Sequence, residues 1–344
     1  MADEISLFPK PLTSVFDEYA KAGFEIYLVG GGVRNIIEGK VPENCDLTTN
    51  ATPEESLEVL KNHNPFYNND FGTVSFNVSV GEKEELYEIT TYRSEKEYSD
   101  FRRPDKVSWG KTLEEDVTRR DFTINAIVIG IKNSKIQKLK NSKEEYELID
   151  MVDGLKDFEK GLIRAVGEPR KRFGEDALRM MRAIRFAARL GFSIENSTLT
   201  AITEKAELLA KISKERIREE LMRIIGSSYP ADGVRLLIST GLIEHFMPEL
   251  LEGKDVPQGG HHTLSVLDHI LESLQECPST DPIIRLATIL HDIGKPRSQR
   301  FKCRRCGKMF RDLSEDTITC AFCGFTQPTR GMITFYGHEV IGAK

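Results

Sequence analysis

The stretch that decides the fold is Val29–Asn35, VGGGVRN. It begins at the last residue of a short, mostly apolar run, Glu25–Val29. Glycines at the end of a strand let backbone N–H groups approach an anion closely, and the start of a following helix adds a favourable dipole. A tight strand-to-helix turn needs the same glycines, so this motif alone fits either a phosphate site or a plain turn. Either way, the sequence predicts a strand, a glycine turn and a helix here.

The periodicity of apolar residues divides the chain into a mixed part and a helical part. Short strands are predicted at 25–29, 71–78, 87–92 and 127–131. The polar segment Glu95–Lys111 is predicted to be a mobile loop. From about residue 155 strand signals vanish, and helices are expected at 177–190, from Ser213 as N-cap, at 232–240 and at 283–290. Gly191 should end the first of these helices.

The composition is that of an ordinary globular protein. With 344 residues, of which 39% are hydrophobic and 30% charged, two or three domains are expected. No apolar run approaches the ~20 residues of a membrane span, and Met1–Ile5 lacks the features of a secretory signal. We therefore expect a cytoplasmic protein with no membrane partner. The net charge of -6 only weakly disfavours RNA, because phosphate binding depends on local clusters of cations.

Three further blocks follow the glycine turn in a fixed order. They are Cys45–Pro53 (CDLTTNATP), Arg119–Ala126 (RRDFTINA) and Glu175–Arg179 (EDALR), the last of which should open a long helix. The ordered set resembles the class II tRNA nucleotidyltransferases, or CCA-adding enzymes, and their relatives the bacterial poly(A) polymerases. The resemblance runs from about Pro11 to Ala343, apart from a cysteine-rich insertion. It implies an α+β fold with a polymerase-β-like antiparallel head, a helical neck and body, and nucleotidyl transfer to an RNA 3′ end.

The resemblance assigns nucleotide contacts to two of these blocks. It implies that phosphates are bound by Gly30, Gly31 and Arg34, whereas Asn35 departs from the family's aspartate. Contacts to the sugar and phosphates would come from Arg119, Arg120, Asp121 and Asn125. Because Asp121 and Asn125 are four residues apart, a helix would stack them on one face. A helix cap and a solvent-exposed salt bridge would explain the same residues.

The Glu175–Arg179 block would select the base. By resemblance, Asp176 and Arg179 present hydrogen bonds to the Watson–Crick edge of CTP or ATP, and Glu175 orients Arg179. The match extends through Arg182, Arg185 and Phe186. A simple intrahelical ion pair between Asp176 and Arg179 is the alternative. The surrounding basic residues would equally suit a solvated helix face: Lys171, Arg172, Arg179, Arg182, Arg185 and Arg189.

The metal-binding acids depart from the family pattern. Residues 44 and 46 should share one face of a strand, where the family carries two aspartates that hold Mg²⁺. Here only Asp46 is charged, and Asn44 offers a neutral oxygen. Glu43 cannot substitute, because it would point to the opposite face. Glu88, on a predicted neighbouring strand, is either a further carboxylate of the catalytic site or an ordinary surface glutamate.

Histidines near the C-terminus resemble an HD domain, in which His and Asp ligands bind metals for phosphoester hydrolysis. By resemblance the ligands are His262, His291 and Asp292, with His338 auxiliary and His269 a weaker candidate. The family's later aspartate would lie past Lys344, so this site is expected to be incomplete in the chain. Packing within helices is the alternative role for these histidines.

Four of the six cysteines form two C-x-x-C pairs, Cys303/Cys306 and Cys320/Cys323, separated by 13 residues and each followed by glycine. This spacing predicts a structural zinc ribbon, whereas two disulfides are disfavoured in a reducing cytosol. Lys302, Arg304, Arg305 and Lys308 would permit contact with RNA, but a purely structural role is favoured. Cys45 and Cys277 are interpreted as packing residues.

The sequence therefore predicts a nucleotidyltransferase head at 1–150, an RNA-binding helical neck and body at 151–253, and an HD domain at 254–344 with the zinc ribbon at 301–326. The favoured function is template-independent CCA addition or repair on tRNA from CTP and ATP. It would use Mg²⁺, structural Zn²⁺ and a second divalent metal in the HD site. The alternatives are a non-catalytic RNA-binding relative, a poly(A) polymerase and an HD phosphohydrolase. The sequence does not indicate the oligomeric state.

Overall fold

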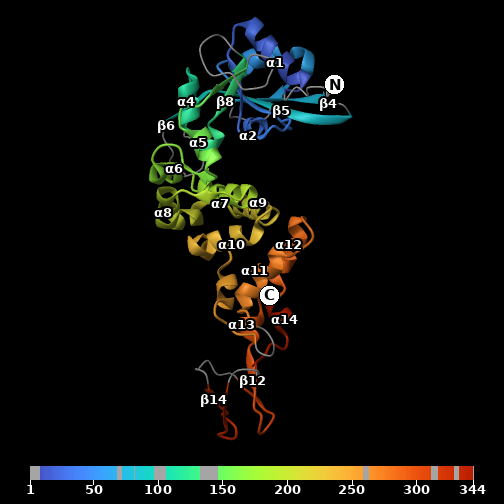
Figure 1. Ribbon diagram of the computed structural model, residues 1–344, viewed down its shortest axis with the longest axis vertical. Helices are drawn as coiled ribbons and strands as arrows, with labels where there is room; N and C mark the ends of the chain where they lie inside the picture. The colour runs from blue at the N-terminus through green and yellow to red at the C-terminus, as the bar shows by residue number, and fades with distance from the viewer. Residues whose placement is uncertain are drawn as a thin grey trace. The chain divides into compact units, whose positions relative to one another are not determined.

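The computed structural model describes residues 8–67, 72–80, 82–96, 106–131, 146–258, 263–310, 317–328 and 333–343. The chain forms two compact units (Figure 1). The first contains Met1–Arg179 and Ser193–Ala201, and the second contains Met180–Phe192 and Ile202–Lys344. The finer division into three domains stays a prediction. Within the described residues, no helix combines the length and apolar character that crossing a membrane requires.

A seven-stranded sheet organises the first unit, in the order β3-β4-β5-β2-β1-β8-β9. Its strands are β1 (Ile26–Val29), β2 (Asp46–Thr49), β3 (Phe66–Tyr67), β4 (Thr73–Val80), β5 (Lys83–Thr91), β8 (Val128–Ile131) and β9 (Tyr146–Ile149). The four strands predicted from the sequence are confirmed with small shifts of their ends. The expectation of an antiparallel head is wrong in one respect, because β2 and β5 run parallel. The sheet is therefore mixed.

Helices and small elements complete the first unit. They are α1 (Lys10–Ala22), α2 (Gly31–Ile37), α3 (Pro53–Val59), η1 (Lys61–His63), α4 (Leu113–Thr118), η2 (Thr123–Asn125), α5 (Gly154–Glu159), β10 (Leu162–Ile163), α6 (Pro169–Glu175), β11 (Ser193–Ile194) and α8 (Asn196–Lys205). The short strands β10 and β11 pair in parallel, so strand structure does continue beyond residue 155. The core under the sheet contains Phe16 of α1 together with Phe76 and Ile89. Burial of such side chains is the main stabilising contribution.

A two-stranded ribbon stands where a mobile loop was predicted. β6 (Arg93–Lys96) pairs antiparallel with β7 (Lys106–Trp109), and the residues between them lie outside the described part of the chain. Trp109 packs so closely on Gly72 that a Cβ there would lie 2.4 Å from the indole ring. The prediction of a loop over Glu95–Lys111 is therefore wrong at both of its ends.

The second unit is helical. It contains most of α7 (Leu178–Leu190), followed by η3 (Ala206–Lys211), α9 (Lys214–Ile225), α10 (Pro230–Ser239), η4 (Leu242–His245), η5 (Pro248–Gly253), α11 (Val266–Gln275), α12 (Pro282–Leu290), α13 (Lys295–Ser298) and α14 (His338–Gly342). The predicted helices are confirmed, and Gly191 ends α7 with a φ of 70°. Gly233 lets α10 approach its neighbours, because a Cβ there would lie 2.6 Å from Ile224 and 2.9 Å from Ala188.

The cysteine-rich insertion forms short strands between α13 and α14. β13 (Met309–Phe310), β12 (Arg300–Lys302) and β16 (Ile333–Thr334) make one small sheet, and β14 (Thr317–Thr319) pairs with β15 (Thr326–Pro328). Their apolar core is small and includes Phe301, Phe310 and Ile318. So little apolar burial is characteristic of domains that need a metal or disulfides for stability.

Gly154 allows α5 to touch the segment that carries Asn125, which generates a first prediction. A Cβ at Gly154 would lie 2.2 Å from the carbonyl oxygen of Thr123. We expect Gly154→Ala to destabilise the first unit by about 3 kcal/mol, because backbone cannot move aside cheaply. Urea unfolding followed by the fluorescence of Trp109, the chain's single tryptophan, measures this.

Gly174→Ala is the matched control. Gly174 lies within α6, where a Cβ would meet nothing within 4 Å. Alanine there should be neutral or stabilising by up to about 1 kcal/mol, because it favours the helix. Equal unfolding midpoints for the two variants would contradict the prediction.

Candidate active site

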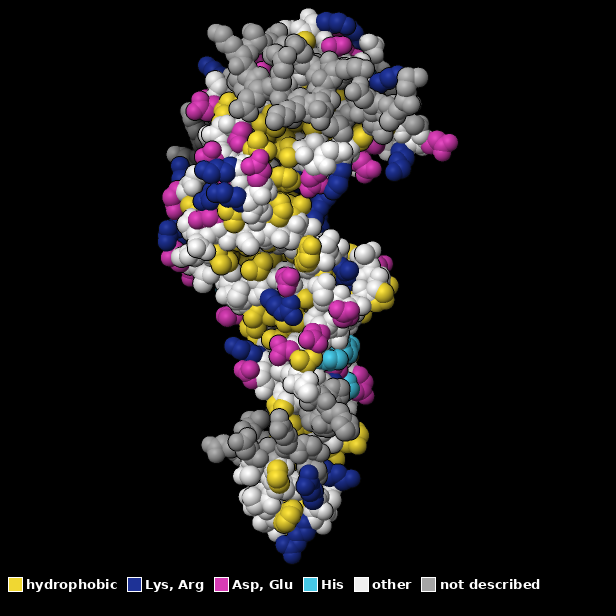
Figure 2. Space-filling view, viewed as in Figure 1, with side chains coloured by type: hydrophobic (Ala, Val, Ile, Leu, Met, Phe, Trp, Pro, Cys, Tyr) yellow, Lys and Arg dark blue, Asp and Glu magenta, His cyan; other side chains and the backbone are white. Residues whose placement is uncertain are grey.

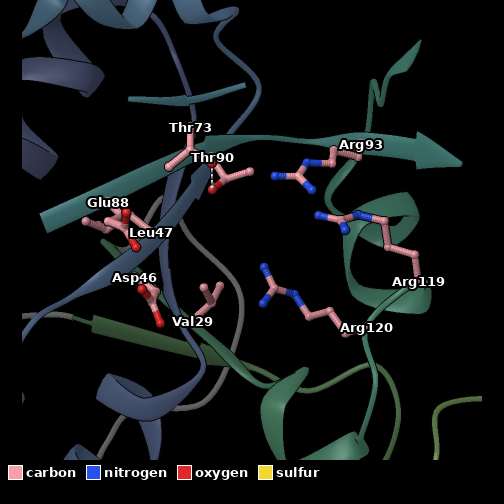
Figure 3. Close-up of a pocket in the computed structure, with 9 residues that line it drawn as sticks. All are labelled: Val29, Asp46, Leu47, Thr73, Glu88, Thr90, Arg93, Arg119 and Arg120. Carbon is pink, nitrogen blue, oxygen red and sulfur yellow. Dashed lines mark hydrogen bonds between the residues drawn. The ribbon is translucent and has the colours of Figure 1, made fainter. Parts of the chain in front are cut away.

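A cavity of about 290 Å³ opens beside the central strands β1, β2 and β5 of the seven-stranded sheet (Figure 3). Its lining residues are Val29, Asp46, Leu47, Thr73, Glu88, Thr90, Arg93, Arg119 and Arg120. Figure 3 shows two carboxylates on one wall and three guanidinium groups that point toward them from the opposite wall. Such an arrangement can bind an anion and a cation side by side.

The two carboxylates come from neighbouring parallel strands. Asp46 is the first residue of β2, and its register partner is Glu88 in β5. Enclosure by the pocket raises the pKa of Asp46 above its usual range, and the negative charge of Glu88 raises it further. The guanidinium groups of Arg120 and Arg34 oppose this rise. Because the two acids repel one another, a divalent cation at this wall would be stabilised by both.

Asn44 does not share a strand face with Asp46, so that expectation is wrong. Asn44 precedes β2 and adopts a left-handed conformation with a φ of 49°, which asparagine tolerates better than most residues. Its Oδ1 accepts a hydrogen bond from the N–H of Leu86 at 3.2 Å. In this position Asn44 connects the start of β2 to β5. The carboxylate beside Asp46 is that of Glu88.

The glycine turn lies directly against Asp46. Gly30 has a φ of 67°, a backbone conformation that residues other than glycine rarely adopt. A Cβ at Gly30 would lie 3.6 Å from Oδ2 of Asp46, and α2 begins at Gly31. The predicted order of strand, glycine turn and helix is confirmed. The turn therefore places its backbone beside the carboxylates of Asp46 and Glu88, which together form the acid wall of the cavity.

Arg34 links the glycine turn to the Arg119–Ala126 block. It is buried and donates a hydrogen bond to Oδ1 of Asn125, whose amide nitrogen donates to Oδ1 of Asp121 at 2.9 Å. Asp121 and Asn125 therefore contact one another, as their spacing suggested. They do not lie on one face of a helix, because α4 ends at Thr118 and only the 3₁₀ turn η2 follows.

Asp116 holds Arg119 and Arg120, two of the three arginines that line the cavity, in place. This carboxylate is fully buried, and it accepts hydrogen bonds from Arg119 Nε at 3.1 Å, Arg120 Nη2 at 2.7 Å and Thr48 Oγ1 at 3.2 Å. Burial alone would raise the pKa of Asp116, but Arg120 and Arg119 hold it well below its usual range. The sequence analysis missed this residue. Its spacing of three and four residues from the two arginines was the available signal.

Arg93 is the second residue that the sequence analysis missed. It begins β6 and lines the cavity together with Thr73 and Thr90, whose hydroxyl groups lie 3.1 Å apart. Arg93 lies two residues before the segment Glu95–Lys111 that was predicted to be a loop. Only the pairing of β6 with β7 reveals that a strand carries its side chain to the pocket.

The Glu175–Arg179 block spans a break between two helices. Glu175 is the last residue of α6, Asp176 is extended with a φ of −142°, and α7 begins at Leu178. The expectation that one helix carries Asp176 and Arg179 on a shared face is therefore wrong. Oδ1 of Asp176 instead accepts a hydrogen bond from the N–H of Leu178 at 3.0 Å.

Glu175 does contact Arg179, as the resemblance implied. Oε2 of Glu175 accepts hydrogen bonds from Arg179 Nη1 at 2.6 Å and from Arg172 Nη1 at 2.9 Å. Nη2 of Arg179 also donates to the carbonyl oxygen of Arg119 at 3.3 Å. Arg179 is thereby tied to the residue whose guanidinium lines the cavity.

Arg182 and Arg185 belong to the second unit. Arg185 forms a nearly buried ion pair with Glu220 of α9 at 3.2 Å. Its guanidinium carbon lies 4.7 Å from the centroid of the Phe186 ring, and that of Arg182 lies 5.6 Å from it. These contacts fix both arginines on α7.

A second polar cluster gathers around Asp292 in the second unit. His269 Nε2 and His291 Nε2 lie 3.4 and 3.0 Å from Oδ2 of Asp292, and His338 Nε2 lies 3.5 Å from its Oδ1. Lys295 Nζ lies 2.6 Å from the same carboxylate. Figure 2 shows histidine side chains, in cyan, gathered on one side of the molecule. His262, the remaining predicted ligand, lies outside the described residues.

The ring nitrogens of this cluster are oriented by backbone. His291 Nδ1 lies 2.7 Å from the carbonyl oxygen of Thr288, and His338 Nδ1 lies 2.8 Å from that of Phe335. A carbonyl oxygen can only accept a hydrogen bond, so each Nδ1 carries a proton. In a neutral ring Nε2 then has the lone pair, and in both histidines Nε2 faces Asp292, where a metal ligand would have to point.

The four ribbon cysteines form a third cluster. Cys303 Sγ lies 3.6 Å from Cys323 Sγ, and Cys306 Sγ lies 3.7 Å from Cys320 Sγ. Four thiolates around tetrahedral zinc, with Zn–S of ~2.3 Å, lie ~3.8 Å apart. Gly307 and Gly324 follow the two pairs with φ of 71° and 66°, which closes each loop around its sulfurs. The sulfur positions therefore fit zinc.

Two family models match separate parts of the chain. Residues 26–164 match the family model of the poly A polymerase head domain, and residues 191–253 match that of the probable RNA and SrmB-binding site of polymerase A. The first unit is therefore similar to poly A polymerase head domains. Neither match extends past residue 253, so the histidine and cysteine clusters lie outside both.

Individual relatives extend this comparison. The CCA-adding enzyme of Limosilactobacillus reuteri (strain DSM 20016) is 42% identical over 236 residues, 69% of this chain and 54% of the relative. The structure of the Bacillus stearothermophilus CCA-adding enzyme in complex with CTP is 35% identical with a TM-score of 0.55, and covers 67% of this chain and 51% of that one. The Thermotoga maritima CCA-adding enzyme complexed with tRNA shares the fold at 23% identity and a TM-score of 0.60, over 84% and 64% of the two chains. The chain spans about half the length of the curated relatives it matches.

The burial of Asp116 generates a second prediction. Asp116→Asn removes the charge that both arginines share, so we expect a loss of about 3 kcal/mol in the free energy of unfolding at pH 7. The lowered pKa of Asp116 makes its contribution complete above the usual aspartate pKa of ~3.9. The difference between wild type and variant should therefore shrink as the pH falls below about 4.

Urea unfolding at pH 7, 5 and 3 measures this difference. Glu114→Gln, an exposed acid on the same helix, is the control and should change stability by less than about 0.5 kcal/mol. A difference between wild type and Asp116→Asn that grows toward low pH would be incompatible with this role for Asp116.

Proposed function

We propose that this chain transfers nucleotides from CTP and ATP to the 3′ end of tRNA, and so adds or repairs the CCA terminus without a template. The observation that carries the proposal is the cavity in which Asp46 and Glu88 face three arginines. The head-domain match and the relatives named CCA-adding enzymes support it. The segment at 191–253 is proposed to bind the RNA.

The reaction joins the 3′ oxygen of the RNA to the α-phosphorus of the nucleotide. A P–O bond forms, the bond between the α-phosphorus and the bridging oxygen breaks, and pyrophosphate leaves. Arg93, Arg119 and Arg120 are proposed to bind the triphosphate oxygens, assisted by the backbone of Gly30 and Gly31. These donors stabilise the charge that develops on the leaving group.

The acid wall is proposed to bind Mg²⁺ through Asp46 and Glu88, with Asn44 as a supporting contact to β5. The pair fits this ion, because two carboxylate oxygen donors meet at one end of the cavity and the repulsion between them is relieved by a cation. Bound there, Mg²⁺ would lower the pKa of the 3′ hydroxyl and neutralise the triphosphate.

Base selection is proposed to rest on Asp176 and Arg179. Glu175 and the carbonyl oxygen of Arg119 hold the guanidinium of Arg179, so its orientation is fixed before a nucleotide arrives. Asp121 and Asn125 are proposed to contact the sugar. Arg182 and Arg185 are proposed to extend the nucleotide contacts along α7.

Substitution in the acid wall tests this function. Asp46→Asn should lower kcat for CTP and ATP incorporation by about a thousandfold or more, because it removes several kcal/mol of transition-state stabilisation. Glu88→Gln should lower kcat by at least tenfold. The assay incubates tRNA lacking its terminal nucleotides with each labelled nucleoside triphosphate singly and Mg²⁺. Glu43→Gln, an exposed neighbour, is the control.

The same assay separates the alternatives. Runs of incorporated ATP without CTP would support a poly(A) polymerase instead. A non-catalytic RNA-binding relative would be supported if the wild type binds tRNA without incorporating nucleotides and the Asn44→Asp variant incorporates them. An unchanged rate of nucleotide incorporation in the Asp46→Asn variant would show that the acid wall takes no part in the reaction.

A metal-dependent phosphohydrolase at the Asp292 cluster is the second candidate function. The favouring observation is that His269, His291 and Asp292 bring their ligand atoms within 4.8 Å of one another. Nε2 of His338 also faces the Asp292 carboxylate. These residues fit a divalent metal, which would supply a water of lowered pKa for removal of terminal or cyclic phosphates.

His291→Ala tests this second function. We expect the variant to lose one bound Mn²⁺ or Ni²⁺ per chain, because it removes a ring nitrogen oriented toward the cluster. Hydrolysis of a 2′,3′-cyclic phosphate end to a phosphomonoester should fall with it. Metal content by elemental analysis and conversion of the cyclic end to the monoester are the measurements. His245→Ala, an exposed histidine of η4, is the control, and equal metal content in the two variants would refute the site.

We further propose that Cys303, Cys306, Cys320 and Cys323 bind one structural Zn²⁺. Their sulfur separations and the two glycine turns support this. Zinc would supply the stability that the small apolar core of the insertion cannot.

A further inference from the structure

The insertion at residues 300–328 carries a surface that its zinc site and small core do not use. Four basic side chains of its first half are exposed: Lys302, Arg304, Arg305 and Lys308. Within 300–310 and 317–328, the part that the structure describes, there are five Lys or Arg residues and no Asp or Glu. The whole segment 300–328 has six basic and three acidic residues in a chain of net charge -6. Zinc and four thiolates would subtract two charges, which still leaves the insertion positive.

An exposed aromatic ring lies beside one of these cations, Lys308. Phe322, between Cys320 and Cys323, is 56% exposed, whereas the core of the insertion is built from Phe301, Phe310 and Ile318. Nζ of Lys308 lies 4.8 Å from the centroid of the Phe322 ring. The ring therefore adds little to packing and stands beside a cation from the other cysteine loop.

A buried glutamine fixes the two cysteine loops to one another. Gln327 is 2% exposed; its Oε1 accepts from the N–H of Arg304 at 2.8 Å, and its Nε2 donates to the carbonyl oxygen of Lys302 at 3.0 Å. These bonds hold the basic loop and the loop that carries Phe322 in one arrangement. On the face that Figure 2 shows, basic and apolar side chains lie next to one another over this insertion.

We propose that the insertion is an RNA-binding surface, on which phosphates contact the exposed cations and an unpaired base stacks on Phe322. Cations along a surface follow a phosphate backbone, and an aromatic ring accepts any base on its face. Single-stranded RNA segments offer both groups together. A protein partner fits less well, because charged residues as a class are depleted from the centres of protein interfaces, whereas four exposed cations lie on this insertion. That the RNA is tRNA rests on the function proposed above.

Binding of tRNA lacking its CCA end, followed by fluorescence anisotropy over a series of KCl concentrations, tests this surface. Phe322→Ala should weaken binding by about tenfold with little change in salt dependence, because it removes a stacking contact. Lys308→Ala should weaken binding and also reduce the slope of log K against log salt by about one, because it removes a phosphate contact. Thr317→Ala, an exposed polar residue of β14, is the control.

Zinc content is measured on every variant, so that loss of the fold is separated from loss of contact. Phe322→Leu keeps an apolar side chain but removes the ring. If the alanine variant no longer holds zinc, the leucine variant replaces it in the test and should show the same loss of tRNA affinity. Equal tRNA affinity for wild type and the zinc-loaded variants would overturn the proposal. Loss of self-association instead of RNA affinity would assign the surface to protein contacts, and would overturn it as well.

Nucleotide incorporation distinguishes this proposal from the function of the head. The variants should raise KM for tRNA and leave kcat unchanged. If the Phe322 and Lys308 variants incorporate nucleotides and bind tRNA as tightly as the wild type, only the proposed RNA-binding surface is refuted. Binding that depends on Phe322 and Lys308, in a protein that incorporates no nucleotide, would refute only the nucleotidyl transfer.

Discussion

One buried carboxylate, that of Asp116, fixes the basic wall of the cavity. It is ionised although it is fully buried, because Arg119 and Arg120 each donate to it and hold its pKa low. Thr48 of β2 donates to the same carboxylate, so the arginine pair is tied to the strand that begins with Asp46. A guanidinium that already has an anchored partner loses little entropy when it binds a phosphate. The basic wall is therefore prepared before a ligand arrives.

The acid wall depends on a different constraint, the parallel register of β2 and β5. A strand slip of one residue would move Glu88 to the other face of the sheet and leave Asp46 alone. The turn at Asn44 supports this register, because its side chain bonds to the N–H of Leu86 in β5. Asn44 thus contributes to geometry at a position where the sequence suggested only a missing charge.

Local sequence patterns predicted most elements but not how distant elements pair. The glycine turn, the four strands β1, β4, β5 and β8 of the seven-stranded sheet, and the helix of residues 178–190 follow from nearby residues and were predicted. The parallel pairing of β2 with β5 joins segments some forty residues apart, which no local periodicity encodes. The break at Asp176 was missed for a related reason, because spacing alone cannot distinguish one helix from two. Asp116 was overlooked because an acid in a helix usually faces solvent.

The charges around the cavity are compatible with the proposed nucleotidyl transfer, although Asp46 is the only aspartate of the acid wall. Two carboxylates line the cavity opposite three guanidinium groups, and these guanidinium groups can attract an anion locally. The same carboxylates repel that anion unless a cation accompanies it. Binding of the triphosphate and of Mg²⁺ should therefore be mutually favourable, since each neutralises what repels the other. Glu88 supplies the second negative charge from a neighbouring strand, so the balance of charge depends on the pairing of β2 with β5 rather than on residue 44.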